Sequence, residues 1–193
     1  MMLAEPMLDP KTAAREAAIL PGGFEVCVRA ASLEDEDPLR AMFSRLSTQT
    51  VYRRFHAPYP RVPGWALGLF LNVDHRYRES LVAVAVVEGE VVGHAMYARS
   101  SGGRGEAEIG IVIEDAWQGK GIGKLLLSRL AAEAQRRGVA AFTGEVLGEN
   151  RRVLGFFSAA FPAPRFTASG GAYHIFAPLG SPRPTLGLAR EGG

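Results

Sequence analysis

The sequence predicts a mixed α+β domain, in which helices flank a central, mostly antiparallel, twisted sheet of about six to seven strands. Two runs rich in β-branched residues, 80–87 and 91–98, are separated by a short turn at Gly89, which predicts a β-hairpin. A third strand is expected over residues 106–113. Directly after it, apolar positions at helical spacing predict an amphipathic helix over residues 119–137.

The other elements follow from the same patterns. We expect strands at 24–30 and 140–147, a closing hairpin at 166–168 and 173–177, helices at 32–46, 48–56 and 150–160, and a further apolar stretch at 65–71.

The length of the chain and the positions of its proline and glycine residues suggest one domain with two tails. A short helix over residues 9–19 ends at Pro21 and is interpreted as an appendage. We therefore divide the 193 residues into an N-terminal extension (1–22), a single domain (23–178) and a flexible, Pro- and Gly-rich C-terminal tail (179–193).

Composition indicates a soluble globular protein. Apolar residues make up 47% of the chain and charged residues 22%, which fits neither a disordered nor a membrane-embedded protein. The longest apolar run, 81–87, is far shorter than the roughly 20 residues that span a bilayer. The first twenty residues lack the pattern of a signal peptide, and the single Cys27 excludes an intramolecular disulfide. We expect a cytoplasmic protein that does not bind membranes.

The charge balance gives no reason to expect nucleic acid as a partner. The net charge is only +2. The basic pairs at 53–54 and 136–137 are interpreted as solvated helix faces.

The most informative stretch, residues 108–124, joins a strand, a short polar loop, a glycine-rich turn and a helix. The alternate glycines from Gly119 to Gly123 let the backbone approach a pyrophosphate without side-chain obstruction. A helix N-terminus has unpaired N–H groups and a partial positive charge, so it favours phosphate. Lys120 and Lys124 in the first turn oppose the helix dipole unless an anion lies in front of them. This stretch therefore predicts a phosphate-binding turn.

Spacing excludes two better-known phosphate-binding turns. A P-loop requires a glycine where this chain has Gln118, and Ser or Thr where it has Leu125. The dinucleotide-binding fingerprint requires Gly-x-Gly-x-x-Gly, whereas these glycines occur at every second residue.

The segment Gln118-x-x-Gly121-x-Gly123 matches the Q/R-x-x-G-x-G/A signature of the GCN5-related N-acetyltransferase (GNAT) family. The order of elements over residues 24–177, with Asn150 just after the following strand, also resembles that family. The resemblance implies the GNAT fold with a splayed pair of strands, and acetyl-CoA as co-substrate.

A second, finer resemblance concerns three stretches. Residues 107–109, 33–55 and 73–76 are similar to the acetyltransferase domain of bacterial Pat-type protein lysine acetyltransferases. Those enzymes often carry extra regulatory or nucleotide-binding domains, which this chain lacks, so a protein lysine is the favoured acceptor rather than an established one.

The family resemblance implies where the coenzyme lies. The pantetheine arm would pair with the backbone of a strand that splays from its neighbour, the pyrophosphate would lie on the glycine turn, and an asparagine would stand close by. The residues in these roles are Ile111, Val112 and Ile113 for the arm; Gln118, Gly119, Lys120, Gly121, Ile122, Gly123 and Lys124 for the turn; and Asn150. Arg151 and Arg152 would approach the 3′-phosphate or form a solvated helix start.

Acyl transfer to an amine requires a base, and two glutamates are candidates. Glu108 occupies the place of the proposed base in the Pat-type domain, and partial burial would make it a stronger base. Glu145 lies five residues before Asn150, where ribosomal-protein N-terminal acetyltransferases place their glutamate. We prefer Glu108; the competing interpretation is that both, with Glu106, are ordinary polar strand positions.

The acid is left open. Many family members use a tyrosine where this chain has Phe157, which has no proton to donate. Tyr173, a water relay or unassisted departure of the thiolate are the alternatives, and the backbone N–H of Ile113 or its neighbours would polarise the carbonyl. The four histidines lack metal-ligand spacing, so no metal is expected, although His94 is a candidate for the acceptor cleft.

These observations predict an acetyl-CoA-dependent N-acetyltransferase that acts by direct transfer in a ternary complex. The acceptor is a primary amine, with a protein lysine favoured over a small molecule. The alternative from another class is a catalytically silent acyl-CoA-binding or interaction module, suggested by Phe157. Loops at 56–78 and 98–106 would contact the acceptor, the aromatic and apolar residues at 65–71 would wall it or form core, and both a monomer and a homodimer fit the sequence.

Overall fold

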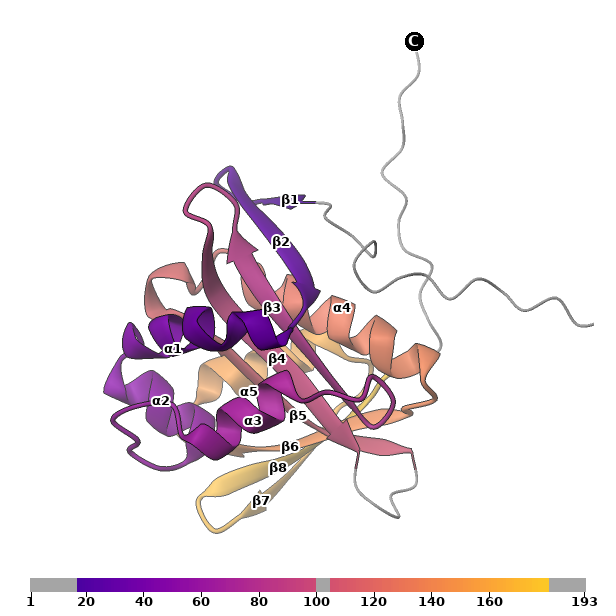
Figure 1. Ribbon diagram of the computed structural model, residues 1–193. Coiled ribbons are helices and arrows are strands. Elements are labelled where there is room, and N and C mark those ends of the chain that lie inside the picture. The colour runs from indigo at the N-terminus through magenta and orange to yellow at the C-terminus, as the bar shows by residue number, and fades with distance from the viewer. Residues whose placement is uncertain (1–16, 100–104, 181–193) are drawn as a thin grey trace, which may run out of the picture.

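Eight strands form one mixed sheet in the order β1-β2-β3-β4-β5-β6-β8-β7 (Figure 1). The computed structural model describes residues 17–99 and 105–180. The strands are β1 (Ala17–Leu20), β2 (Phe24–Ala30), β3 (Arg78–Ala85), β4 (Glu90–Arg99), β5 (Glu106–Ile113), β6 (Ala141–Leu147), β7 (Arg165–Ser169) and β8 (Ala172–Pro178). The predicted fold class is confirmed, and one short edge strand that the sequence did not predict, β1, raises the number of strands to eight.

Helices cover both faces of this sheet. They are α1 (Glu36–Ser44), α2 (Thr48–Phe55), α3 (Gly64–Leu71), α4 (Ile122–Arg136) and α5 (Arg151–Ala160), with short 3-10 turns η1 (Leu33–Asp35) and η2 (Asp115–Trp117). In Figure 1, α1, α2 and α3 lie in front of the sheet, while α4 and α5 lie behind it.

The splayed pair of strands is β5 and β6. All other neighbouring strands are antiparallel, whereas β5 and β6 are parallel and are joined by the crossover helix α4. Their pairing ends with Glu108 opposite Thr143. From residue 109 to 113, β5 pairs with β4 on one side and with no described strand on the other. The opening predicted from the family resemblance is therefore present.

Alternating side chains of β5 serve two separate apolar cores. Ile109, Ile111 and Ile113 pack on the core beneath α4, which is built around fully buried residues such as Leu126 and Phe142. Val112 belongs to the other core, beneath α1 and α3. Because successive residues of a strand point to opposite faces, Glu108 and Gly110 share the face of Val112.

The N-terminal segment departs from the sequence prediction. The helix expected over residues 9–19 lies mostly outside the described residues, and its last three residues, 17–19, belong to strand β1 instead. Ala17–Leu20 pairs in antiparallel register with β2, so tertiary pairing overrides the local helix signal. Leu20 and Pro21 then border Gly121 of the glycine turn.

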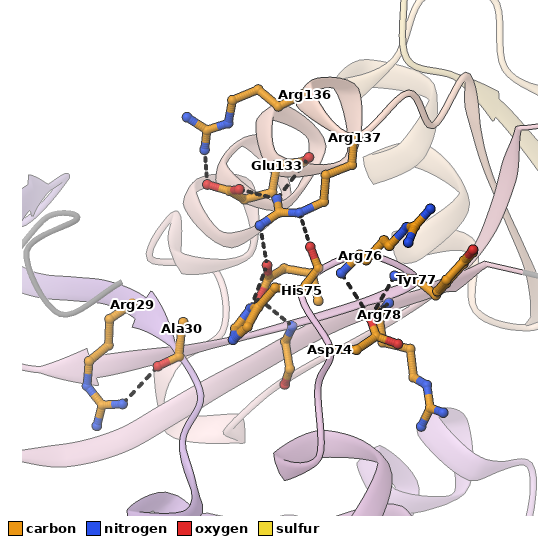
Figure 2. Close-up of polar contacts among 12 residues, drawn as sticks. Arg29, Ala30, Asp74, His75, Arg76, Tyr77, Arg78, Glu133, Arg136 and Arg137 are labelled. Atoms are coloured by element: carbon orange, nitrogen blue, oxygen red, sulfur yellow. Dashed lines mark hydrogen bonds and ion pairs between the residues drawn. The ribbon is translucent and has the colours of Figure 1, made fainter. Parts of the chain in front are cut away.

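A polar cluster fixes the far end of α4 to the loop that precedes β3. Figure 2 shows Glu133 and Arg137 of α4 next to this loop, which carries His75. The buried Glu79 carboxylate lies 3.0 Å from Arg137 Nη2 and 3.1 Å from His75 Nδ1. Asp74 Oδ1 accepts hydrogen bonds from three backbone N–H groups, those of residues 76–78. The stretch 73–76 that resembles Pat-type domains therefore lies in a structural cluster.

Asp35 joins β2 to the first helices. Its buried carboxylate accepts two hydrogen bonds from Arg29, at 2.7 and 2.6 Å, and one from the backbone N–H of Ser32 at 2.8 Å. Burial alone would raise the pKa of Asp35, but these hydrogen bonds outweigh burial and hold the pKa below its usual value.

We expect Asp35→Asn to lower the free energy of unfolding by about 1–3 kcal/mol at pH 7, because charge-assisted hydrogen bonds are lost. A carboxylate with a lowered native pKa stabilises the fold above its unfolded pKa of about 3.9, and the stabilisation is lost as the pH falls through the native value. Denaturant titrations should show a constant difference from wild type between about pH 5 and 7. The difference should shrink below about pH 4.

The matched control is Asp37→Asn, which removes an exposed carboxylate from the same region. A difference for Asp35→Asn that persisted unchanged at about pH 3 would contradict the role assigned to its charge.

Candidate active site

A single cavity of about 760 Å³ connects the glycine turn with the opening between β5 and β6. Its wall includes the backbone-rich segment 109–113, the glycine turn from Gln118, and the start of α5 at Asn150. On the other side it is lined by side chains of α2 and α3. Most of the site residues predicted from the sequence border this cavity. They are Glu108, Ile111, Val112, Ile113, Gln118, Gly119, Gly121, Gly123, Lys124, Glu145 and Asn150.

The glycine turn has the conformation that its glycines permit. Gly119 and Gly121 have φ of 80° and 95°, a region that other L-residues adopt only with strain. Gly121 is the N-cap of α4, so the first N–H groups of this 15-residue helix lie at the cavity wall. The turn therefore presents unpaired donors and the positive end of a helix dipole, which fits a pyrophosphate.

Gln118 links three elements around the turn. Its Nε2 donates to the carbonyl of Ile113 at 3.1 Å, and its Oε1 accepts from Arg152 Nη1 at 3.1 Å. Nε2 also lies 3.5 Å from Thr50 Oγ1 of α2. Asn150 caps α5, since its side chain accepts from the backbone N–H of Val153. Both polar residues thus hold the walls of the cavity in place.

The side chains of two residues predicted to bind the coenzyme, Lys120 and Ile122, do not line the cavity that their neighbours border. The Lys120 ammonium sits 4.2 Å from the Phe24 ring centre and 4.5 Å from that of Trp117. Lys120 does not border the cavity, and the side chain of Ile122 is buried in the core beneath α4. Cation–π contacts therefore offset the unfavourable position of Lys120 at the helix start. The coenzyme roles assigned to Lys120 and Ile122 stay predictions, and they depend on the backbone N–H groups of these residues rather than on their side chains.

The two candidate bases lie on neighbouring strands at the cavity. Glu108 stands at the last paired position before β5 and β6 diverge. Its side chain is exposed, so the structure does not supply the burial that would make it a stronger base. Glu145 on β6 is 61% exposed, and its Oε1 lies 3.4 Å from His56 Nδ1.

The candidate acids are placed unequally. Phe157 is buried, stacks on Phe161 and borders the cavity, so a phenyl ring occupies the site of the usual tyrosine. Tyr173 does not border this cavity and lines a separate hollow at the β7–β8 turn. Of the alternatives left open by the sequence, a water relay or unassisted departure fits this arrangement better than Tyr173.

The wall formed by α2 and α3 is rich in aromatic rings. Phe55, Trp65 and Phe70 border the cavity, as does Leu69, whereas Leu71 belongs to the core. His94 is fully buried beneath this wall, where its Nε2 lies 2.8 Å from Ser80 Oγ and its ring packs on Phe70. Burial lowers the pKa of His94 to about 3, so His94 is neutral and does not line the acceptor cleft.

Sequence reasoning missed Arg54, which was assigned with Arg53 to a solvated helix face. Arg54 instead borders the cavity, and burial lowers its pKa to about 10, while the nearby Glu108 carboxylate acts in the opposite direction. The helical spacing could have indicated this inward position. Arg54 is three residues after Val51 and directly before Phe55, and these two apolar residues lie on the inner face of α2.

Among residues 17–99 and 105–180, no three His, Cys, Asp or Glu side chains are grouped so that they could hold a metal ion. No helix in the described part of the chain is long and apolar enough to cross a membrane.

Comparison with known proteins identifies the family. A model of the Acetyltransferase (GNAT) family matches residues 39–161, well over half of the chain. The chain therefore belongs to the GNAT acetyltransferase family, and the resemblance seen in its motifs is confirmed.

Two curated relatives are named acetyltransferases. Acetyltransferase Pat of Mycolicibacterium smegmatis is 33% identical over 105 residues, which cover 54% of this chain and 31% of that protein. Acetyltransferase PA5475 of Pseudomonas aeruginosa is 29% identical over 121 residues, which cover 62% of this chain and 64% of that protein. The chain thus spans less than two thirds of the length of each relative.

Solved structures support the same assignment. The GNAT domain of S. lividans PAT superposes with a TM-score of 0.77 and 27% identity, covering 84% of this chain and 95% of that domain. A cAMP-binding acyltransferase from Mycobacterium smegmatis has a TM-score of 0.59 and 22% identity over 84% of this chain and 46% of that protein, and shows the shared fold. The family uses acetyl-CoA, which implies acetyl-CoA as the co-substrate of this chain.

We expect Gly121→Ala to weaken acetyl-CoA binding by up to about tenfold, because alanine at a positive φ costs about 1–2 kcal/mol and distorts the turn. The matched control is Gly89→Ala in the β3–β4 turn, where φ is 68° and an added Cβ meets no atom within 4 Å.

Thermal melts should show that both variants are destabilised to a similar degree, while calorimetry should show weaker coenzyme binding for Gly121→Ala alone. If the two variants bound the coenzyme with equal affinity, the glycine turn would not be part of the coenzyme-binding site.

Proposed function

We propose that the chain is an N-acetyltransferase that passes the acetyl group of acetyl-CoA directly to a primary amine held in the same cavity. One observation carries this proposal: a single cavity is lined by the glycine turn, by the unpaired edge of β5 and by Glu108. Its volume of about 760 Å³ lies in the range of small-molecule sites. Donor and acceptor can therefore meet without an intermediate carrier on the protein.

The chemistry assigned to the chain uses few groups. The Glu108 carboxylate accepts the proton of the acceptor ammonium, and the free amine then attacks the thioester carbonyl. Backbone N–H groups on the open edge of residues 109–113 stabilise the developing oxyanion. A C–N bond forms and the C–S bond breaks. The attacking nitrogen releases its second proton to water, and the CoA thiolate takes a proton back from water, because Phe157 cannot supply one.

The acceptor that we favour is a protein lysine. The support is the similarity of residues 107–109, 33–55 and 73–76 to Pat-type domains, together with relatives that carry the name Pat. A small-molecule amine is the second candidate. Phe157 in place of tyrosine supports the third, a silent acyl-CoA-binding module.

We expect Glu108→Gln to lower kcat by about 10²- to 10⁴-fold, the usual contribution of a general base, with the acetyl-CoA Kd unchanged. Glu145→Gln should change kcat by only a few-fold, since its carboxylate is exposed beside His56. The matched control is Glu106→Gln on the same strand, which does not border the cavity.

The assay is mass spectrometry of products formed from labelled acetyl-CoA with lysine peptides and a panel of amines. If Glu108→Gln keeps full activity while Glu145→Gln loses it, the base is Glu145. If coenzyme binds and no amine is acetylated in a whole-cell lysate, the silent module replaces the enzyme.

A further inference from the structure

Arg54 is a cation in the wall of the cavity, and it makes no hydrogen bond within residues 17–99 and 105–180. The last turn of α2 places its guanidinium against β5. A Cβ at Gly110 would lie 2.4 Å from Arg54 Nη2 and 2.7 Å from Cζ, so the guanidinium rests on the backbone of Gly110. Glycine at this position makes that close approach possible.

The Arg54 guanidinium remains charged although the residue is half-buried in the wall of the cavity. Its Nε is inaccessible to water and has no acceptor among the described residues, and the group makes no ion pair within the part of the chain that the structure describes. Its pKa of about 10 leaves it protonated at neutral pH.

Contacts within the fold stabilise this charge only in part. Its Cζ lies 5.2 Å from the Phe55 ring centre and 5.7 Å from that of Phe70, and such cation–π contacts contribute about 0.5–2 kcal/mol each. Ring faces accept no in-plane hydrogen bond from a guanidinium. A half-buried charge whose Nε–H is shielded from water and has no acceptor among the described residues is costly, so the arrangement favours an anion in the cavity.

The position of Arg54 separates it from the phosphate end of the cavity. Thr50, one helical turn earlier, touches Gln118 beside the glycine turn. Arg54 lies over Gly110, which is three residues, or about 10 Å, along β5 from Ile113. It is therefore on the side of Glu108, where the acceptor amine is expected.

The other charged groups of the cavity do not neutralise Arg54. Arg53 adds a second cation whose Nε is also buried and has no partner among the described residues. Lys124 and Arg152 stand at the coenzyme end, and Glu145 is close to His56. Glu108 remains as the nearby anion, and it influences Arg54 by charge alone, without a hydrogen bond.

We propose that Arg54 binds a carboxylate of the acceptor, so that the acceptor is a primary amine with a carboxylate about 7 Å away. Residues 108 and 110 share one face of β5, and their backbone positions are about 6.6 Å apart, so we expect the amine and the carboxylate of the acceptor at about this spacing. The planar N–H fork of arginine matches a carboxylate in two parallel hydrogen bonds. This proposal rests on the proposed function, and its chemistry is shared by an ω-amino acid and by a peptide lysine beside an acidic residue.

The test compares acceptors that differ only in that charge. One arm uses ω-amino carboxylates from glycine to 6-aminohexanoate, each against its primary amide. The other arm uses lysine peptides with Glu or Gln beside the lysine. Wild type should favour the carboxylate of the best-fitting pair by about tenfold to a hundredfold in kcat/KM, mainly through KM.

Arg54→Gln should abolish this preference, because it should lower kcat/KM for the carboxylate acceptor far more than for its primary amide, with the CoA Kd within about twofold of wild type. Arg54→Lys, which keeps the charge but not the fork, should retain part of it. The matched control is Arg40→Gln, which removes the same charge from an exposed position on α1. The set of acceptors that shows the Arg54-dependent preference, either the ω-amino carboxylates or the lysine peptides, tells whether the acceptor is a small molecule or an acidic peptide.

Calorimetry with the CoA complex provides a second readout that does not depend on turnover. If carboxylate compounds bind in an Arg54-dependent way and no amine is acetylated, the subsite stands and the proposed function fails. The proposal is overturned if acetylation or binding occurs without any preference for the carboxylate. It is also overturned if Arg54→Gln lowers kcat/KM equally for charged and neutral acceptors, because Arg54 is then a structural residue.

Discussion

The divergence of β5 from β6 after Glu108 is the constraint on which the rest of the site depends. Backbone N–H and C=O groups of a strand require partners, yet residues 109–113 have them on one side only among the described strands. The crossover helix α4 must join the two strands, so its N-terminus lies at the mouth of the same opening. One topological feature therefore brings together an open strand edge, a helix N-terminus and a carboxylate.

The alternation of side chains along β5 then divides the site between two layers. Odd-numbered positions such as Ile111 anchor the strand to the core beneath α4, on the side of the glycine turn. Even-numbered positions, Glu108 and Gly110, face the layer of α1, α2 and α3, where Arg54 and the aromatic wall lie. The donor side thus depends on backbone geometry, whereas the acceptor side depends on side chains that helices bring from elsewhere in the chain.

This division explains what the sequence could and could not predict. The fold class and the glycine turn follow from local patterns: a hairpin, a strand followed by an amphipathic helix, and alternate glycines, of which Gly119 and Gly121 have positive φ in the structure. The inward position of Arg54 and the contact of Lys120 with Phe24 depend on packing between segments far apart in sequence. Strand β1 forms because β2 offers an edge, which local propensity does not encode.

The central claim is that the open edge of β5 receives the pantetheine arm while α4 receives the phosphates. Amide hydrogen exchange measured with and without CoA tests it directly, because N–H groups that acquire a hydrogen-bonded partner exchange more slowly. The account predicts added protection at those amides of residues 109–113 that point toward the opening and at the glycine turn, with little change at residues 106–108, which are already paired with β6. Saturating CoA that left the exchange of residues 109–113 unchanged would contradict the account.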